Sequence, residues 1–238
     1  MKKIPLIFII ILFPALVAAH GDVPHLSVDA GTLPGGIKYS FERLGEWFSV
    51  NLLTVSTKAK QEKYLKQAEE RLAELEELYS YADQKEKNLN KALAGYRSSL
   101  GRAEDMAEKI IFLDGTEIAI AYDLEKKTRT YEKVMGELLE ENAPKSDSAR
   151  QAMTAAREQN EKIFKFIVEK YQFNDGDIEK NKAIIADEIN FAESKAKGLD
   201  KQKAGEISGH IKEARNFLKF GLNMRAYDEV KKAKDILY

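Results

Sequence analysis

From residue 37 to the end of the chain, apolar side chains recur every three or four positions, and this spacing constrains the fold most strongly. Two runs follow a strict three-four rhythm, which is typical of a coiled-coil seam. The first run is Leu65, Ala68, Leu72, Leu75 and Tyr79, and the second is Leu89, Leu93, Tyr96, Leu100, Ala103, Ala107 and Ile110. Only 14 Gly and 5 Pro interrupt the 238 residues, and no alternating strand pattern of useful length occurs. The sequence predicts an all-α protein, an elongated antiparallel helical bundle of long amphipathic helices with coiled-coil-like seams.

The segment between these two runs, residues 80–88, contains neither Gly nor Pro. Its heptad register passes through Ala82 and Glu86 without a slip, so one very long helix is one interpretation. A turn near Asp83 is the other. We favour the turn, because a glutamate at a seam position would be costly to bury within a packed pair of helices.

Breaks later in the chain suggest two regions. Pro144 disfavours helix at the residue before it, which separates an N-terminal helical bundle region, residues 37–142, from a C-terminal helical region, residues 143–238. Near the end, two helical runs flank Gly221-Leu222-Asn223 and predict a C-terminal helical hairpin. Gly198-Leu199-Asp200 indicates the end of one helix and the N-cap of the next.

The first 19 residues have the layout of a secretory signal peptide. Lys2 and Lys3 precede an uncharged stretch from residue 4 to 19, which ends in the small residues Val17-Ala18-Ala19. We therefore expect residues 1–19 to be cleaved and the protein to be extracytoplasmic, either periplasmic or secreted. A retained N-terminal membrane anchor is the alternative. Residues 20–36 hold several Gly and Pro and predict an irregular lead-in.

The first helical run carries an apolar stripe of its own, consisting of Ile37, Phe41, Leu44, Phe48, Leu52 and Val55. We expect this stripe to pack on the rest of the bundle. A membrane-surface helix fits less well, because its polar face mixes acidic and basic residues, whereas membrane-surface helices favour a basic face. Trp47, the only tryptophan, lies beside the stripe, either as part of the core or as an anchor for a partner.

The composition argues against several kinds of chemistry. A formal net charge of −1 argues against nucleic-acid binding, which depends on neutralising phosphates. The absence of Cys excludes a thiol nucleophile and a thiolate metal site. After cleavage, His20 would become the N-terminal residue and could chelate Cu(II) with help from His25, although a tail with two incidental histidines is the simpler interpretation. We expect no cofactor and no catalytic site.

Three motifs resemble a bacterial family known as domain of unknown function 5667. They are Pro34-Gly35 with Tyr39 four residues after the Gly, then Arg43-x-x-Glu46, and then Ala68-x-x-Arg71-Leu72-x-Glu74. The likeness covers roughly residues 33–113, and Phe41-Glu42 departs from the basic pair that the family tends to carry. Members look like exported or membrane-anchored helical proteins, and some are similar to extracytoplasmic parts of anti-sigma regulators. The resemblance implies a location and a fold, but no catalytic residues.

Together these features favour an exported, non-catalytic helical interaction or scaffold protein of the bacterial cell envelope. The expected partner is a protein or an envelope polymer, with contact to a membrane surface and self-association left open. We place the binding surface in residues 34–74, with the candidate residues Tyr39, Arg43, Glu46, Trp47, Arg71 and Glu74. Two alternatives are a sensor segment similar to anti-sigma regulators and an enzyme that uses paired carboxylates on an envelope polymer.

Overall fold

The computed structural model describes residues 26, 28–80, 86–114, 118–141, 147–170 and 175–238. Helices dominate these ranges, and no strand occurs within them. The helices are α1 (Ile37–Asn51), α2 (Thr57–Ser80), α3 (Glu86–Asp114), α4 (Ile118–Glu141), α5 (Asp147–Lys170), α6 (Asp175–Ala196), α7 (Lys201–Lys219) and α8 (Asn223–Leu237). The prediction of an all-α helical bundle is confirmed.

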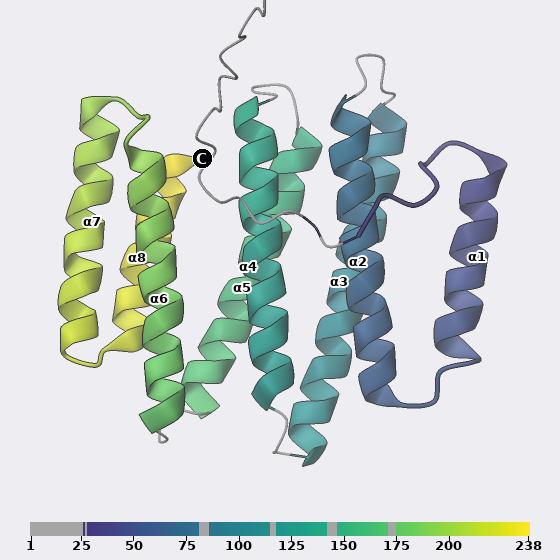
Figure 1. Ribbon diagram of the computed structural model, residues 1–238, viewed down its shortest axis with the longest axis horizontal. Coiled ribbons are helices and arrows are strands. Elements are labelled where there is room, and N and C mark those ends of the chain that lie inside the picture. Colours follow the sequence, from purple (N-terminus) through teal and green to yellow (C-terminus); the bar gives the residue numbers. More distant parts are fainter. Residues whose placement is uncertain (1–25, 27, 81–85, 115–117, 142–146, 171–174) are drawn as a thin grey trace, which may run out of the picture.

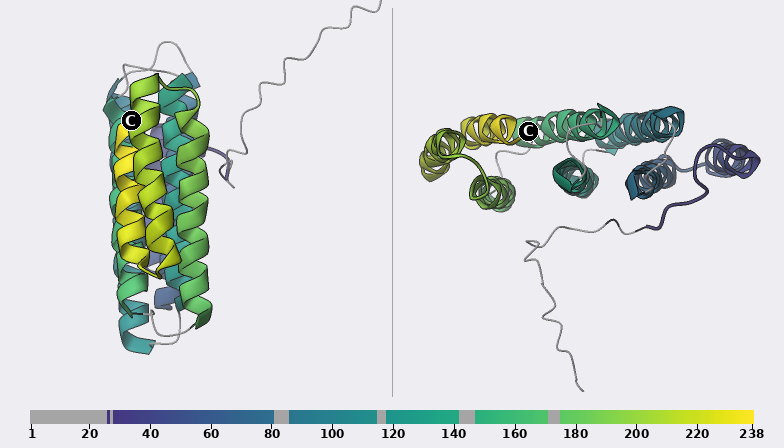
Figure 2. Two further views of the ribbon diagram at one scale, coloured as in Figure 1. Left: turned by 90° about the vertical axis from the view of Figure 1, so that its left-hand side faces the viewer. Right: turned by 90° about the horizontal axis from the view of Figure 1, so that it is seen from above.

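The helices stand side by side and form a broad array two layers thick. Figure 1 shows α2, α4 and α6 in front of α3, α5 and α8, with α7 at one end of the array and α1 at the other. The view from above in Figure 2 shows the same two layers and α1 alone at its edge. Consecutive helices run in opposite directions, as predicted for an antiparallel bundle. The terminal position of α1 leaves one side of this helix without a neighbour from the described chain.

Two apolar cores fill the array. The first is built mainly by α2 to α5, and it contains the predicted seam residues Leu72, Leu75, Tyr96 and Leu100, all nearly inaccessible to solvent. The second is built by α5 to α8 around side chains such as Phe164. The two cores meet along α5, which packs against α4. The predicted boundary at residue 142 therefore falls between two packed helices.

The structure agrees with the turns expected from the sequence where it describes them. Helix α2 ends at Ser80, α3 begins at Glu86, and the two helices pack against each other. Glu86 is exposed, so this glutamate does not enter a packed seam. Residues 81–85, including the proposed turn position Asp83, lie outside the described residues.

The predicted C-terminal hairpin is present as α7 and α8. The carboxylate of Asp200 accepts hydrogen bonds from the backbone N–H groups of Gln202 and Lys203, both at 3.0 Å, and thereby caps α7. The turn into α8 uses Gly221 with φ of 70°, a backbone conformation that favours glycine.

The first helix differs from the prediction in one important respect. The stripe of Ile37, Phe41, Leu44 and Phe48, expected to pack on the bundle, is exposed to solvent, and only Tyr39 and Val50 of α1 are buried. The expectation that the stripe forms part of the core is therefore wrong. Periodicity identified the residues that share a face of the helix, but α1 turns the opposite face toward the bundle.

Within the described residues, no helix combines the length and the apolar character that crossing a bilayer requires.

Candidate interaction surface on the first helix

The start of α1 is fixed by a short irregular segment. Pro34 is buried, and Gly35 has φ of 124°, which a residue with a side chain rarely adopts. A Cβ atom at Gly35 would lie only 3.1 Å from the side-chain nitrogen of Asn88 on α3. The Pro-Gly motif therefore brings the chain close to α3 and sets the direction in which α1 begins.

The inner face of α1 is held by a charged cluster with Arg71 of α2 at its centre. The Arg71 side chain is completely buried, and its guanidinium forms ion pairs with Glu46 of α1 and with Glu74 of its own helix. Glu46 also forms an ion pair with Arg43, at 3.2 Å. The Arg71 guanidinium lies over the Tyr39 ring, 5.2 Å from the ring centre. These contacts position α1 against α2 through polar groups.

A glycine on α3 makes room for the buried arginine. A Cβ atom at Gly95 would lie 3.2 Å from the Cδ atom of Arg71 and 3.7 Å from a guanidinium nitrogen of Arg43. Because a side chain there would crowd both arginines, Gly95 allows the cluster to lie directly against the α3 backbone. The position of the charges thus depends on three helices.

The C-terminal end of α1 is held by further hydrogen bonds. The Lys63 ammonium donates to the hydroxyl of Ser49 at 2.6 Å, and the Thr54 hydroxyl donates to the backbone carbonyl of Ser49 at 2.7 Å. Val50 is the main apolar contact of this end with the core. The inner face of α1 therefore contacts the rest of the bundle at both ends and in the middle of the helix.

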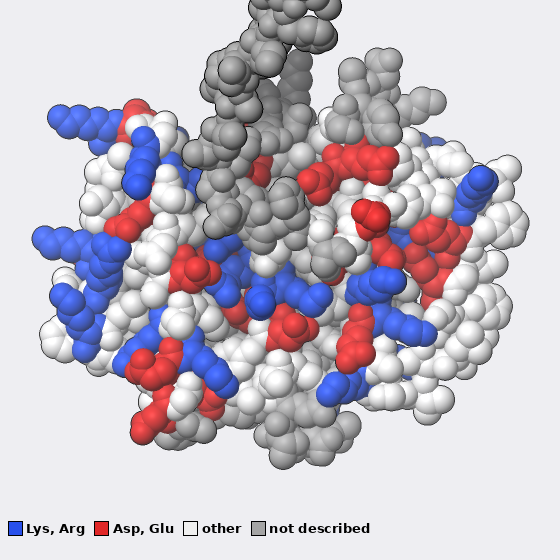
Figure 3. Space-filling view, viewed as in Figure 1, with Lys and Arg blue, Asp and Glu red and all other residues white. Residues whose placement is uncertain are grey.

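The outer face of α1 is apolar and exposed. We use the name outer stripe for Ile37, Phe41, Leu44, Phe48, Leu52, Leu53 and Val55, which run along α1 and into the loop that follows it. These side chains are between 45 and 93% exposed. Trp47 flanks the stripe, is 49% exposed and packs edge-to-face on Phe48 with ring centres 5.2 Å apart. Figure 3 shows that the edge of the molecule formed by α1 is mostly free of charged side chains.

The size of the outer stripe is unusual for an uncovered surface. If a fully exposed large apolar side chain presents roughly 150–250 Å², these residues together leave on the order of 800 Å² of apolar surface in water. The largest apolar patch on a typical monomeric protein is about 300–600 Å², and larger patches mark interaction sites. The outer stripe is therefore the strongest candidate for a binding surface in the described part of the chain.

A groove lies beside α1, between this helix and the helices α2 and α3. It has a volume of about 350 Å³ and is lined by both polar and aromatic side chains. Its lining includes Arg43, Trp47, Tyr64, Gln67, Ser98 and Arg102. The Arg102 guanidinium stacks on the Tyr64 ring, 5.6 Å from the ring centre. The groove adjoins the outer stripe through Trp47, so both belong to one surface region.

The six candidate residues divide into two groups. Tyr39, Arg43, Glu46, Arg71 and Glu74 form the charged cluster, in which Arg71 and Glu74 have no accessible side-chain surface. These two residues position α1 and cannot touch a partner in this conformation. Trp47 lies apart from the cluster, at the outer surface. The proposed copper ligands His20 and His25 lie outside the described residues.

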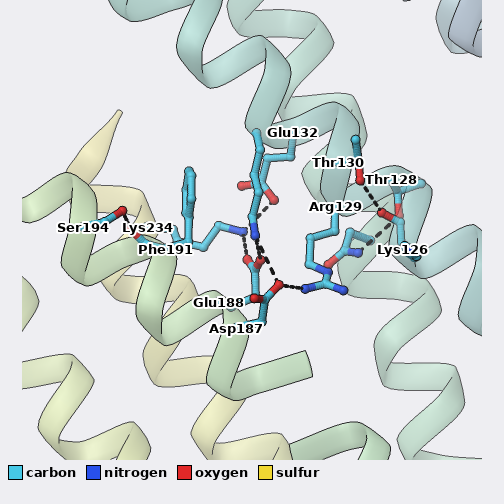
Figure 4. A network of polar contacts seen from close by, with 12 residues as sticks. Lys126, Thr128, Arg129, Thr130, Glu132, Asp187, Glu188, Phe191, Ser194 and Lys234 are labelled. Carbon is cyan, nitrogen blue, oxygen red and sulfur yellow. Dashed lines mark hydrogen bonds and ion pairs between the residues drawn. The ribbon is translucent and has the colours of Figure 1, made fainter. Parts of the chain in front are cut away.

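A second buried charge network, which sequence reasoning missed, joins α4, α5, α6 and α8. Figure 4 shows the part formed by Glu132, Glu188 and Lys234. Lys234 of α8 is ion-paired with Glu132 of α4, at 2.6 Å, and with Glu188 of α6. Glu132 also contacts Arg157 of α5 at 2.8 Å, and Glu188 contacts Lys133 of α4 at 3.1 Å. The two glutamates are each about 1% exposed, so the network is closed to a substrate.

The electrostatics of this network favour the ionised forms of Glu188 and Lys234. Burial alone raises the pKa of Glu188, but the positive charges of Lys234 and Lys133 outweigh burial and lower this pKa to about 2. Burial alone lowers the pKa of Lys234, whereas Glu132 and Glu188 raise it above its ordinary value. Glu188 and Lys234 therefore stay ionised near neutral pH, and their ion pair joins α6 to α8.

Other features of the described residues point less clearly to a ligand. No cluster of three or more His, Asp or Glu side chains in these ranges has a geometry that could hold a metal ion. A hollow of about 240 Å³ lies between α3, α4 and α5, lined by Leu124, Ile163 and Phe166, and an ion pair between Lys162 and Glu108 at 3.2 Å borders it.

The sequence model of one family matches this chain, that of the domain of unknown function DUF5667, over residues 31–143. The resemblance inferred from the motifs at residues 33–113 is thereby confirmed, and it extends to the end of α4. No curated protein and no solved structure matches the chain. The matched residues include the outer stripe, the Arg71 cluster and the groove beside α1. They end before α5 to α8, the helices that form the second core.

Proposed function

We propose that this protein, whose residues 31–143 carry a domain of unknown function, is an exported, non-catalytic interaction protein of the bacterial cell envelope. In this proposal α1 is the binding element, and the outer stripe is the surface that contacts a protein partner. Export is inferred from the signal-peptide layout of residues 1–19.

One observation carries the proposal: α1 turns its apolar face outward, while polar contacts hold its inner face against α2. Apolar surface in water costs about 25 cal/mol for each Å² left uncovered. The inner face of α1 carries Glu46, which is paired with the buried Arg71 of α2, so turning the stripe inward would separate this ion pair. A helix held in this way presents a prepared apolar surface, which a partner can cover without first ordering it.

The chemistry of the stripe favours a protein over an envelope polymer. Polysaccharides present many hydroxyl groups, which lose hydrogen bonds to water when they are placed against an apolar surface. The outer stripe contains only aliphatic and phenyl side chains and offers no side-chain donors or acceptors in return. An amphipathic helix from another protein fits such a surface, because it can cover the stripe with apolar residues of its own.

The proposed absence of catalysis is supported by the way in which buried carboxylates are used. Glu132 and Glu188 are paired with the same lysine, and Glu74 is paired with Arg71. A general acid or base must reach a substrate, and none of these three carboxylates is accessible. Their arrangement suits a rigid support for a binding helix.

Polar substitution of the stripe is expected to abolish partner binding without unfolding the protein. Phe41→Ser and Phe48→Ser should each remove most of the partner recovered by crosslinking in cells, because aromatic anchors dominate such interfaces. The melting temperature should change by no more than a few degrees, because both side chains are already exposed. The measurement is the amount of crosslinked adduct, read together with thermal unfolding of each purified variant.

Phe220→Ser is the matched control, since Phe220 is 79% exposed at the turn between α7 and α8, at the opposite end of the array. The amount of crosslinked adduct from Phe220→Ser should equal that from the wild type. Unchanged adducts for both α1 variants, at wild-type expression, would show that the stripe is not the binding surface.

A further inference from the structure

We propose that the partner covering the outer stripe is a second copy of this chain, so that two α1 helices pack against each other across a two-fold axis. This inference rests on the proposed function, since it names the occupant of the same surface.

The spacing of the stripe fits a partner that is itself a helix. Ile37, Phe41, Leu44 and Phe48 follow the three-four rhythm of a coiled-coil seam, in which each side chain enters a space between residues of a facing helix. Helix α1 lies at the edge of the array, and a further helix could pack against its uncovered side (Figure 2).

The sequence of the stripe is self-complementary when two copies run antiparallel. With a two-fold axis between Leu44 and Gly45, Phe41 of one copy faces Phe48 of the other. Ile37 then faces Leu52 of the second copy in the same way. Because no residue of the stripe is charged, pairing it with itself brings no like charges together.

Small residues next to the stripe allow the two helices to approach closely. Gly45 has open space where a Cβ atom would be, with no atom within 4 Å. In the antiparallel arrangement Leu44 of each copy faces Gly45 of the other, so the leucine side chain can occupy the space that the glycine leaves empty. Ser40 borders the stripe on its other side and adds little bulk.

The area of the stripe is sufficient for a stable dimer. Standard protein interfaces bury about 800 Å² on each partner. The whole outer stripe exposes apolar area on the order of 800 Å² by the same side-chain values as above, and the paired residues from Ile37 to Leu52 contribute the larger part of it.

The charges around the stripe favour a second copy over a membrane surface. Helices that bind anionic lipids carry Lys and Arg along the border of their apolar face. On α1 this border carries Lys38 together with Glu42, which gives no net positive charge. A lipid surface therefore gains nothing electrostatically from α1.

Cysteine crosslinking tests the arrangement directly, because the natural chain has no Cys. The protein is produced from the full-length gene and purified in its exported form. Near a two-fold axis two identical side chains lie close together, so Leu44→Cys should form a disulfide-linked dimer on mild oxidation. The matched control is Leu222→Cys, at a comparably exposed leucine in the turn between α7 and α8. We expect dimer formation at least about tenfold faster for Leu44→Cys, since association raises the effective thiol concentration.

Light scattering then gives the mass of the unmodified protein. We expect a dimer for the wild type, and a monomer with unchanged helix content for Phe41→Asp, because pairing would bury two facing carboxylates. A monomeric wild type, or equal disulfide rates at the two positions, would overturn the inference.

Two outcomes separate this inference from the proposed function. If the wild type is monomeric and crosslinking in cells still depends on Phe41, the partner is a different protein and only the second copy is excluded. If the monomer instead sediments with phosphatidylglycerol vesicles and Phe41→Asp abolishes this, the occupant is lipid, and both proposals fail.

Discussion

Replacing Lys234 by methionine is expected to lower the free energy of unfolding by about 3–5 kcal/mol, as is typical when one partner of a buried ion pair is removed. Methionine has a similar volume, so the change removes the charge and leaves little cavity. Glu132 and Glu188 would keep their buried positions but lose the lysine that contacts both of them. Urea unfolding followed by circular dichroism measures the effect.

Acid titration of the same variant gives a second signature. In the wild type the pKa of Glu188 is lowered to about 2, below its value in the unfolded chain of about 4.3. Its ionised form therefore stabilises the fold above the unfolded pKa, and this stability is lost as the pH falls toward 2. Without Lys234 the folded pKa should rise, so the stabilisation by Glu188 should be reduced already at neutral pH.

Lys232→Met is the control on the same helix, because the Lys232 side chain is exposed and contacts a single carboxylate, that of Glu229, at 2.6 Å. This variant should unfold at nearly the wild-type urea concentration. If Lys234→Met also unfolded at that concentration across the pH range, the network would not hold the array together.

Leu72→Asp is expected to destabilise the protein by roughly 4 kcal/mol or more, which is enough to unfold many domains. Leu72 is fully buried in the first core, where a carboxylate would have to lose its hydration or take up a proton. The loss should appear as reduced helical circular dichroism and as a lower midpoint in urea.

Glu76→Ala is a control one turn along α2, at an exposed position. It should have little effect, because exposed helix substitutions to alanine rarely alter stability by more than about 0.5 kcal/mol. Similar losses from Leu72→Asp and Glu76→Ala would contradict the assignment of this seam to the core.

The fold class could be predicted because the relevant signals are local. The three-four spacing of residues such as Leu72 and Leu100 specifies helices with one apolar face, and these residues are buried as expected. Gly221 and Asp200 mark the ends of helices through backbone conformation and capping, which also depend only on near neighbours. Such features can be predicted without knowing which helices pack against one another.

The orientation of α1 could not be predicted by the same reasoning. Its apolar spacing resembles that of a core helix, and only tertiary contacts show that Glu46 faces the bundle. The decisive residue is Arg71, whose burial is unusual for an arginine and depends on Glu46, Glu74 and the small Gly95 meeting around it. Three helices contribute to this site, so no single helix pattern reveals it.

The sequence contains a signal from which the buried position of Lys234 and Glu188 could have been predicted. Lys234 follows Val230 by four residues and lies on the same face as the apolar residues of α8. Glu188 likewise lies between Ile184 and Ala192 at four-residue spacing. Charges placed among apolar residues at helical spacing indicate buried pairs, but the partner of each charge is set by the packing of distant helices.

A photo-crosslinking scan along α1 in cells tests whether this helix contacts its partner through the outer stripe. A photoreactive amino acid is placed in turn at each position from 37 to 51, and adducts are quantified for every variant. We predict maxima at positions 37, 41, 44 and 48, with minima at the inner positions 39, 46 and 50. A flat profile, or maxima at the inner positions, would contradict this contact.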